Sequence, residues 1–249
     1  MTLTMSRGDE SSERLTDPLA DSPWSTPSTV AGFERGLPNE VLMRFAAAER
    51  ERAVNGLAID IGCGAARNSV PLAEQGWRVF GTDLSGPMLE AASRRAVAEG
   101  QTGRVHLALA AMDALPVADH CADLVVAHGI WNLARSSGEL RRAIGEAARV
   151  SRPGAGLFVF TFSRHTLPPD AEPVPGERFV FTQFSGRPQC FLSRDDLIAE
   201  LGGAGFTLDP AVPFAEYNRR PGGMLCGGGP PVIYEAAFRL ESTAAPTFR

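Results

Sequence analysis

The chain has 249 residues, a formal net charge of −5, 44% hydrophobic residues and 21% charged residues. This length fits one α/β domain with additional segments, and the composition excludes collagen, coiled coil and wholesale disorder. Domains that bind nucleic acid usually have a basic surface, so the acidic balance argues against a nucleic-acid partner. All 24 basic residues are arginine, which excludes lysine Schiff-base chemistry and a P-loop lysine.

The cysteines and the N-terminal residues indicate in which cellular compartment the protein is expected. The four cysteines are scattered and have neither zinc-ligand spacing nor the density of a disulfide framework. The first twenty residues lack an apolar signal region, and no apolar run is long enough to span a bilayer. The sequence therefore predicts a cytoplasmic protein without a metal site or a membrane partner. It leaves the oligomeric state open.

The N-terminal part divides in two. Residues 1–22 are polar and rich in Ser and Asp, and are predicted to be a disordered tail. Residues 23–54 become amphipathic, with apolar side chains at helical spacing after the capping pair Pro38-Asn39. We expect this second segment to form an N-terminal helical lid.

Residues 55–249 alternate strand and helix patterns. Strands are predicted near residues 57–61, 77–82, 105–110, 122–127, 157–162, 206–208 and 232–238. The intervening helices begin at capping residues: Ser85, Ser136 with Glu139, and Ser193 with Asp196. This order predicts an α/β fold with a doubly wound, mostly parallel seven-stranded sheet and a terminal antiparallel strand. Ligands of such folds bind at the carboxyl ends of the strands.

Two longer stretches interrupt that alternation. Residues 164–190 carry five prolines and several phenylalanines, and residues 213–231 carry Tyr217 and a glycine cluster. Long loops in compact domains are often functional. We interpret both as loops that bind the acceptor of a reaction.

Three features follow consecutive predicted strands. The first strand ends in Asp60-Ile61-Gly62-Cys63-Gly64, whose glycines allow a ligand close to the backbone at a helix N-terminus. Asp83 ends the second strand about 20 residues later, where a carboxylate can accept both ribose hydroxyls. Asp113 follows the third strand and could accept an adenine amino group. Together they predict a site for an adenosine-type ligand, although each alone has an ordinary structural explanation as a turn or a helix cap.

These residues resemble class I S-adenosylmethionine-dependent methyltransferases from about residue 55 to residue 163. The text Gly62-Cys63-Gly64, with Arg67-Asn68-Ser69 and Asp83-Leu84-Ser85, is similar to the tellurite-resistance and thiopurine methyltransferase branch. That branch methylates small, soft nucleophiles. The family often has a third glycine where this chain has Ala66, whose methyl group would narrow the turn slightly.

The resemblance implies a role for each matching residue. Asp60, Gly62 and Gly64 would border the methionine part of S-adenosylmethionine, and Asp83 would hold its ribose. Leu84 would lie against the adenine, and Met112 and Asp113 at its edge. The full set predicted to bind this cofactor is Asp60, Gly62, Cys63, Gly64, Asp83, Leu84, Met88, Met112, Asp113 and Ala114.

A nicotinamide dinucleotide is the alternative cofactor. Its fingerprint requires a glycine three residues after the second one, but Gly64 is followed by Ala65, Ala66 and Arg67. A second mononucleotide-binding half is not apparent after residue 127. The sequence therefore favours S-adenosylmethionine.

The acceptor side is less well marked. His128, just after the fourth strand, is the candidate general base, with a structural histidine as the alternative. Trp24 and Phe33 are interpreted as parts of the lid that contact substrate, or as simple anchors of the chain. Trp131, Phe181 and Tyr217 are candidates for the acceptor pocket, with core packing as the alternative for the first two.

The sequence thus predicts methyl transfer from S-adenosylmethionine to a small molecule, with a thiol as the hypothesised acceptor. A thiol is partly ionised near neutral pH and needs little help from a base. Methylation of oxygen or nitrogen, a protein acceptor, and a cofactor-binding module without catalysis remain alternatives.

Overall fold

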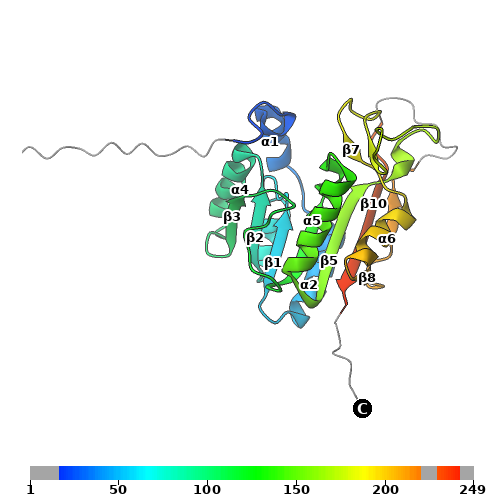
Figure 1. Cartoon of the computed structure of the whole chain (residues 1–249). Coiled ribbons are helices and arrows are strands. Elements are labelled where there is room, and N and C mark those ends of the chain that lie inside the picture. The colour runs from blue at the N-terminus through cyan, green and yellow to red at the C-terminus, as the bar shows by residue number, and fades with distance from the viewer. Residues whose placement is uncertain (1–16, 220–228, 242–249) are drawn as a thin grey trace, which may run out of the picture.

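The computed structural model describes residues 17–219 and 229–241. Figure 1 shows one twisted sheet with helices on both faces. Seven strands follow the order β3-β2-β1-β4-β5-β10-β8, and β9 pairs with β10 as an eighth. The strands are β1 Leu57–Ile61, β2 Arg78–Asp83, β3 Val105–Leu109, β4 Ala122–His128, β5 Ser151–Phe162, β8 Phe206–Leu208, β9 Ala215–Tyr217 and β10 Ile233–Leu240.

The direction of the strands follows the prediction. β1 to β5 pair in parallel, whereas β10 pairs antiparallel with β5, β8 and β9. The predicted mostly parallel sheet with a terminal antiparallel strand is confirmed. All carboxyl ends of β1 to β5 therefore lie at one edge of the sheet, which places the site.

Different helices cover the two faces of the sheet. One apolar cluster joins α2, α3 and α4 to one face, and a second joins α5 and α6 to the other. Central strands are buried on both faces, as parallel sheets require. The helices are α1 Pro27–Glu34, α2 Glu40–Arg52, α3 Ser69–Glu74, α4 Gly86–Ala98, α5 Ser137–Val150 and α6 Arg194–Gly203.

The predicted capping residues begin these helices. The side chain of Asn39 accepts a hydrogen bond from the amide of Leu42, and that of Ser85 from the amide of Met88. Ser136 and Ser193 do the same for α5 and α6. A cap of this kind contributes about 0.5–2 kcal/mol, so the chain's own residues decide where the helices begin.

The N-terminal part is ordered earlier than the sequence predicts. Residues 1–16 lie outside the described residues, but residues 17–22 already form turns, followed by the 3₁₀ helix η1, Pro23–Ser25. The predicted tail boundary at residue 22 is therefore too late. Beyond it, α1 packs on α4 through Val30, Phe33 and Met88, while α2 lies against the face of the sheet. The predicted lid, residues 23–54, thus contains two helices, of which α1 packs on α4 and α2 packs on the sheet.

In the first acceptor loop, residues 164–190, Phe179, Val180 and Phe181 are buried, whereas residues 183–188 at the hairpin tip are exposed. The loop contains the 3₁₀ helix η3, Arg164–Thr166, and a two-stranded hairpin of β6, Val180–Phe181, with β7, Gln189–Cys190. Another 3₁₀ helix, η2, Trp131–Leu133, follows β4 and lies beside β7. The second acceptor loop contains β9, and residues 220–228 of it lie outside the described residues. Across the described ranges, no helix is both long and apolar enough to cross a bilayer.

Candidate functional site

The turn after β1 is built from two glycines. Gly62 has φ +69° and Gly64 φ +52°, a region that other residues rarely adopt. A Cβ at Gly62 would lie 2.6 Å from the Cδ1 atom of Ile130, so a side chain there would collide with the segment after β4. The glycine turn therefore brings bare backbone to the carboxyl edge of the sheet.

Asp83 orders the neighbouring turns. Its carboxylate accepts hydrogen bonds of 2.9 Å from the amides of Gly64 and Ser85. Burial raises the pKa of this carboxyl, although these amide bonds oppose the rise. A carboxylate can accept about four hydrogen bonds, so Asp83 keeps capacity for further donors.

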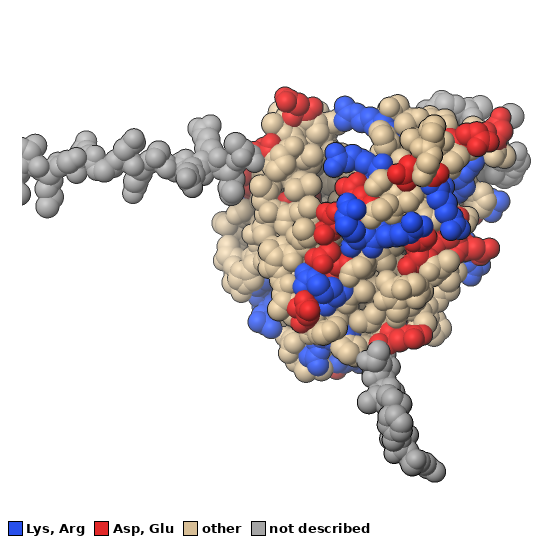
Figure 2. Space-filling model, in the orientation of Figure 1, with Lys and Arg blue, Asp and Glu red and all other residues tan. Residues whose placement is uncertain are grey.

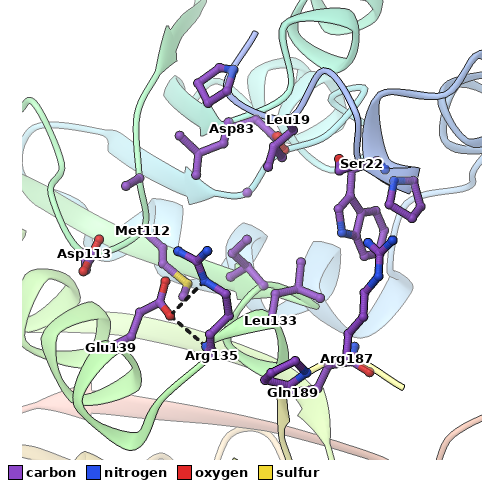
Figure 3. Close-up of a pocket in the computed structure, with 18 of the residues that line it drawn as sticks. Leu19, Ser22, Asp83, Met112, Asp113, Leu133, Arg135, Glu139, Arg187 and Gln189 are labelled. Atoms are coloured by element: carbon purple, nitrogen blue, oxygen red, sulfur yellow. Dashed lines mark hydrogen bonds and ion pairs between the residues drawn. The ribbon is translucent and has the colours of Figure 1, made fainter. Parts of the chain in front are cut away.

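A pocket of about 820 Å³ opens beside Asp83 (Figure 3). Its walls come from segments far apart in sequence: the N-terminal turns, the glycine turn, the ends of β2 and β3, the segment after β4, and the tip of the β6–β7 hairpin. The predicted cofactor residues among them are Gly62, Asp83, Leu84, Met112 and Asp113. Of the predicted substrate residues, Trp24 lines it. The sequence motifs of three strand ends thus meet in one cavity.

The N-terminal turns close one side of this pocket. Asp17 accepts a hydrogen bond of 3.1 Å from the amide of Gly86 at the start of α4, and the hydroxyls of Ser25 and Ser85 are 2.9 Å apart. Pro18, Leu19, Ser22, Pro23 and Trp24 line the cavity. We name residues 17–25 the cover segment.

The other predicted cofactor residues support the site from behind. Asp60 is buried and accepts a 2.6 Å hydrogen bond from Ser69, and burial raises its pKa to about 6. Cys63 is buried against Gly81, and burial raises the pKa of its thiol. Met88 packs against the lid helix α1. These residues do not line the pocket, nor do Gly64 and Ala114.

Asp113 is only partly available. Its carboxylate lies at the edge of the pocket and accepts a 3.0 Å hydrogen bond from Arg142 of α5. This ion pair fixes the loop after β3, because it joins the loop to a helix. Met112, in the same loop, is buried and lines the cavity.

His128, the last residue of β4, lies among hydrogen-bond donors. Its Nδ1 atom is 2.9 Å from a guanidinium nitrogen of Arg67, its Nε2 atom is 3.3 Å from Nδ2 of Asn39, and its ring stacks on Phe160. Burial, aided by the charge of Arg67, lowers the pKa of His128 to about 3. A histidine with such a pKa is neutral at pH 7 and a weak proton acceptor, and it does not line the pocket.

The hydrogen bonds around His128 continue into β10. Asn39 donates a 2.6 Å hydrogen bond to Glu235, and the hydroxyl of Tyr217 donates one of 2.7 Å to the other oxygen of that carboxylate. Glu235 raises the pKa of Tyr217 to about 12. We name these residues, together with Arg67 and His128, the His128 network.

The remaining predicted substrate residues are used in packing. Trp131 is fully buried in the main core, and Phe181 packs with Leu167 and Phe191 in a separate cluster. Phe33 contacts the ring of Trp24 edge to face, with centroids 6.2 Å apart. For Trp131 and Phe181 the structure supports the packing interpretation.

The sequence did not point to several residues that line the pocket. They include Leu19, Arg135 and Glu139, whereas Arg187 and Gln189 lie in the predicted acceptor loop, residues 164–190 (Figure 3). They lie in segments without strand-end motifs, and only the folded chain brings them together. Ser185 and Pro188, within the proline-rich loop, line the pocket with them.

Comparison with known proteins relates this geometry to a family. Residues 58–154 match the family model described as "Methyltransferase domain". A malonyl-[acyl-carrier protein] O-methyltransferase of Salmonella typhimurium is 38% identical over 112 residues, 44% of this chain and 40% of that protein. A ubiquinone/menaquinone biosynthesis C-methyltransferase of Acidiphilium cryptum is 35% identical over 94 residues, 37% of this chain and 36% of that protein.

Residues 58–154 are thus similar to a methyltransferase family, which supports the class I S-adenosylmethionine-dependent methyltransferase that the sequence predicts. The matched residues include the glycine turn, Asp83 and Asp113, which are the parts that meet at the pocket. The finer resemblance to the tellurite-resistance and thiopurine branch stays a prediction. The chain spans 36–59% of the length of the curated relatives it matches.

Solved structures share the fold of this methyltransferase domain at low identity. A Burkholderia thailandensis 1,6-didemethyltoxoflavin-N1-methyltransferase, solved with its substrate and S-adenosylhomocysteine, has a TM-score of 0.58 and 18% identity, covering 82% of this chain and 80% of that chain. The [4+2]-cyclase SpnF has a TM-score of 0.59 and 20% identity, covering 84% and 85%. A cyclase with this fold shows that the fold alone does not fix the reaction.

The residues of the pocket fit S-adenosylmethionine. Asp83 offers spare acceptor capacity at the end of β2, where ribose hydroxyls would lie, and Leu84 and Met112 offer apolar surface for a base. Gly62 supplies backbone without a side chain beside them. These groups match what S-adenosylmethionine requires and support it as the cofactor of the domain.

Proposed function

We propose that the protein transfers the methyl group of S-adenosylmethionine to a small-molecule acceptor. The observation that carries this proposal is the covered pocket, in which the matched motif residues form one wall and the β6–β7 hairpin another. A cavity of about 820 Å³ is in the upper part of the range of small-molecule sites, which extends to about 1,000 Å³. It has room for an acceptor beside the cofactor.

The bound cofactor supplies an electrophilic methyl group on a sulfonium. The chain's residues have to align the acceptor with that methyl group and keep water out. Gly62 and Asp83 form one side of the pocket, because Gly62 directly follows β1 and Asp83 ends β2. The cover segment closes over them, and this closure would exclude water in the way that lids do.

We propose a thiol as the acceptor, because the pocket offers little base catalysis. The titratable side chains that line it are carboxylates and arginines. His128 faces Arg67 and Asn39 instead, and its pKa is about 3. A thiol has a pKa of about 8.5 and ionises in part by itself, whereas a phenol of pKa about 10 depends more on a base. The catalytic role predicted for His128 stays a prediction that this geometry does not favour.

Two alternatives remain for the acceptor atom. The Salmonella and Acidiphilium relatives are named for O-methylation and C-methylation, so the shared domain is compatible with different atoms. An oxygen acceptor that is already a carboxylate would also need no base. A cofactor-binding module without catalysis is the second alternative, and turnover with any acceptor excludes it.

The test is turnover of the full chain with S-adenosylmethionine and matched acceptors. Thiophenol, phenol, aniline and benzoate differ only in the nucleophilic atom, and formation of S-adenosylhomocysteine measures transfer to each. We expect the thiol to react fastest at pH 7. Transfer confined to oxygen or nitrogen would refute the thiol proposal, and absence of transfer despite tight cofactor binding would favour the binding module.

The proposals about cellular location and partners rest mainly on the sequence. We propose a cytoplasmic protein, in accord with Cys63, Cys121 and Cys190, which are free thiols in the structure. Figure 2 shows acidic and basic side chains interspersed on the face it presents, without a continuous basic stripe. This pattern supports a small-molecule partner over a polyanion.

A further inference from the structure

The mouth of the pocket is lined by two arginines that sequence motifs do not mark. Arg135 precedes α5, and Arg187 lies at the tip of the β6–β7 hairpin. Both side chains extend into the cavity from the side opposite Asp83 and Leu19 (Figure 3). Figure 2 shows basic side chains at the rim of the hollow on that face.

The carboxylates of the pocket are already engaged. Asp83 accepts from two backbone amides, and Asp113 pairs with Arg142. Glu139 accepts a 2.7 Å hydrogen bond from the amide of Arg135 and lies 3.7 Å from its guanidinium. None of these carboxylates forms an ion pair with Arg187.

Arg187 itself has no side-chain hydrogen bond or ion pair with any residue in the described ranges 17–219 and 229–241. The hairpin tip is nevertheless organised: the amide of Gly186 donates to the carbonyl of Thr182 at 2.8 Å, and the hydroxyl of Ser185 is 2.7 Å from Gln189. These hydrogen bonds shape the exposed hairpin tip, and the exposed guanidinium of Arg187 has no partner in those ranges. A guanidinium in this state is suited to a carboxylate or phosphate, which it can bind through two parallel hydrogen bonds.

The surroundings of Arg187 indicate what else the ligand carries. Trp24, Ile130, Leu133 and Pro188 line the same cavity and present apolar surface. An amphiphilic molecule fits this combination, with its apolar body against these side chains and its anionic group at the mouth. The positive sulfonium of the cofactor would further favour an anion over a cation nearby.

We propose that the acceptor carries an oxyanion, a carboxylate or phosphate, which Arg187 binds at the mouth of the pocket. This inference rests on the proposed function, because it assigns one end of the acceptor whose other end receives the methyl group. Arg187 is then a specificity-determining residue on the hairpin. Arg135, already paired with Glu139, has a lesser part.

The test compares three probes that differ at one position: 4-mercaptobenzoate, 4-mercaptophenyl phosphate and 4-methylbenzenethiol. Calorimetry measures their binding to the full chain saturated with S-adenosylhomocysteine. We expect at least one charged probe to bind tenfold or more tightly than the methyl probe, since hydrogen bonds to charged groups are strong. The two charged arms decide between carboxylate and phosphate.

The variant Arg187→Gln should abolish most of that preference while leaving the methyl probe and S-adenosylhomocysteine within about twofold of the wild type. Arg78→Gln is the matched control, because it removes the same charge at the exposed amino end of β2. Arg187→Lys should retain part of the preference, since lysine keeps the charge without the planar fork.

The proposal would be overturned by no measurable binding of either charged probe, by no preference for charge in the wild type, or by the same preference in Arg187→Gln. Equal weakening of all three probes would also overturn it, because that result indicates a packing role. Turnover of the same thiols with S-adenosylmethionine is measured separately. Loss of turnover with an intact binding preference would count against the proposed function alone.

Discussion

The polar side chains at the carboxyl edge of the sheet have different surroundings in its two halves. In the half formed by β1 to β3, Asp83 accepts two amide hydrogen bonds and still faces an open cavity. In the half formed by β4 and β10, His128 lies between Arg67 and Asn39. Glu235, 2% exposed, receives donors at both oxygens. A cavity lies beside the polar group of the first half, whereas the polar groups of the second half bond to one another.

The difference teaches how to separate binding residues from positioning residues at such an edge. A polar group with spare hydrogen-bond capacity beside a cavity can bind a ligand, whereas a buried group whose partners are protein atoms mainly holds segments together. The His128 network joins the N-terminus of α2, the glycine turn, β4 and β10. We infer that it fixes the frame on which the pocket is built.

The largest effect is expected at Asp83. Asp83→Ala should weaken binding of S-adenosylhomocysteine by about tenfold or far more, because each hydrogen bond to a carboxylate is worth roughly 1.5–3 kcal/mol. Calorimetry measures the affinity. Asp83→Asn is the matched variant: it keeps the shape and an acceptor, so it should lose less affinity. Unchanged affinity in a folded Asp83→Ala variant would remove Asp83 from the cofactor site.

The cover segment should show the next largest effect. A chain that begins at Asp17 keeps the cover segment, and a chain that begins at Thr26 lacks it, while both lack residues 1–16. We expect the shorter chain to bind S-adenosylhomocysteine at least tenfold more weakly, because Leu19, Ser22 and Trp24 line the pocket. Thermal unfolding of both chains checks that the fold is retained. Equal affinities would show that the cover segment does not act on the cofactor.

This comparison refines the expectation from sequence alone. That expectation places the boundary between the disordered tail and the lid at residue 22. The bond from Asp17 to the amide of Gly86 and the place of Leu19 in the pocket indicate an earlier boundary. Removal of residues 1–20 should therefore cost cofactor affinity.

His128 should affect stability in a pH-dependent manner. Its pKa is about 3 in the folded protein, against an ordinary value of about 6.5 for an unfolded chain. Between these values the unfolded chain binds more protons, so stability is lost as the pH falls from 6.5 towards 3, by up to about 1.4 kcal/mol per pH unit. His128→Gln, which keeps an acceptor for Arg67, should show a shallower loss.

Urea unfolding at several pH values from 4 to 8 measures this effect. Above pH 7 the curves of unfolding free energy against pH should run parallel, because His128 is then neutral in both folded and unfolded states. Parallel curves throughout the acid range would mean that His128 is not buried among donors. A loss of turnover in His128→Gln greater than the loss of stability explains would restore the predicted catalytic role.

The smallest effect on cofactor affinity is expected at Tyr217. Tyr217→Phe removes the hydrogen bond to Glu235 and leaves one oxygen of a buried carboxylate with fewer donors, at a cost of about 1–3 kcal/mol in stability. Cofactor affinity should change by less than about twofold, because Tyr217 does not line the pocket. Denaturant unfolding and calorimetry measure the two quantities. A large change in acceptor binding would instead support its predicted substrate role.

Local chemistry explains why the fold and the cofactor half were predictable. Helix caps such as Asn39 and Ser85 act within three residues, and the glycine turn needs a positive φ that glycine supplies. Parallel strands bring their carboxyl ends to one edge, so motifs at three strand ends had to meet. No such rule places the residues that bind the acceptor. Trp131 and Phe181, which were predicted to bind it, pack in apolar clusters instead.

The sequence by itself determined the alternation of strand and helix, the glycine turn and the position of Asp83, because each depends on neighbouring residues or on strand order. Only the tertiary structure decided that His128 is enclosed by Arg67 and Asn39 and that Arg187 enters the pocket. The physical reason is that these side chains acquire their surroundings from loops and helices distant in the chain. Burial and hydrogen-bond partners, which decide what a polar residue can do, are properties of the packed fold.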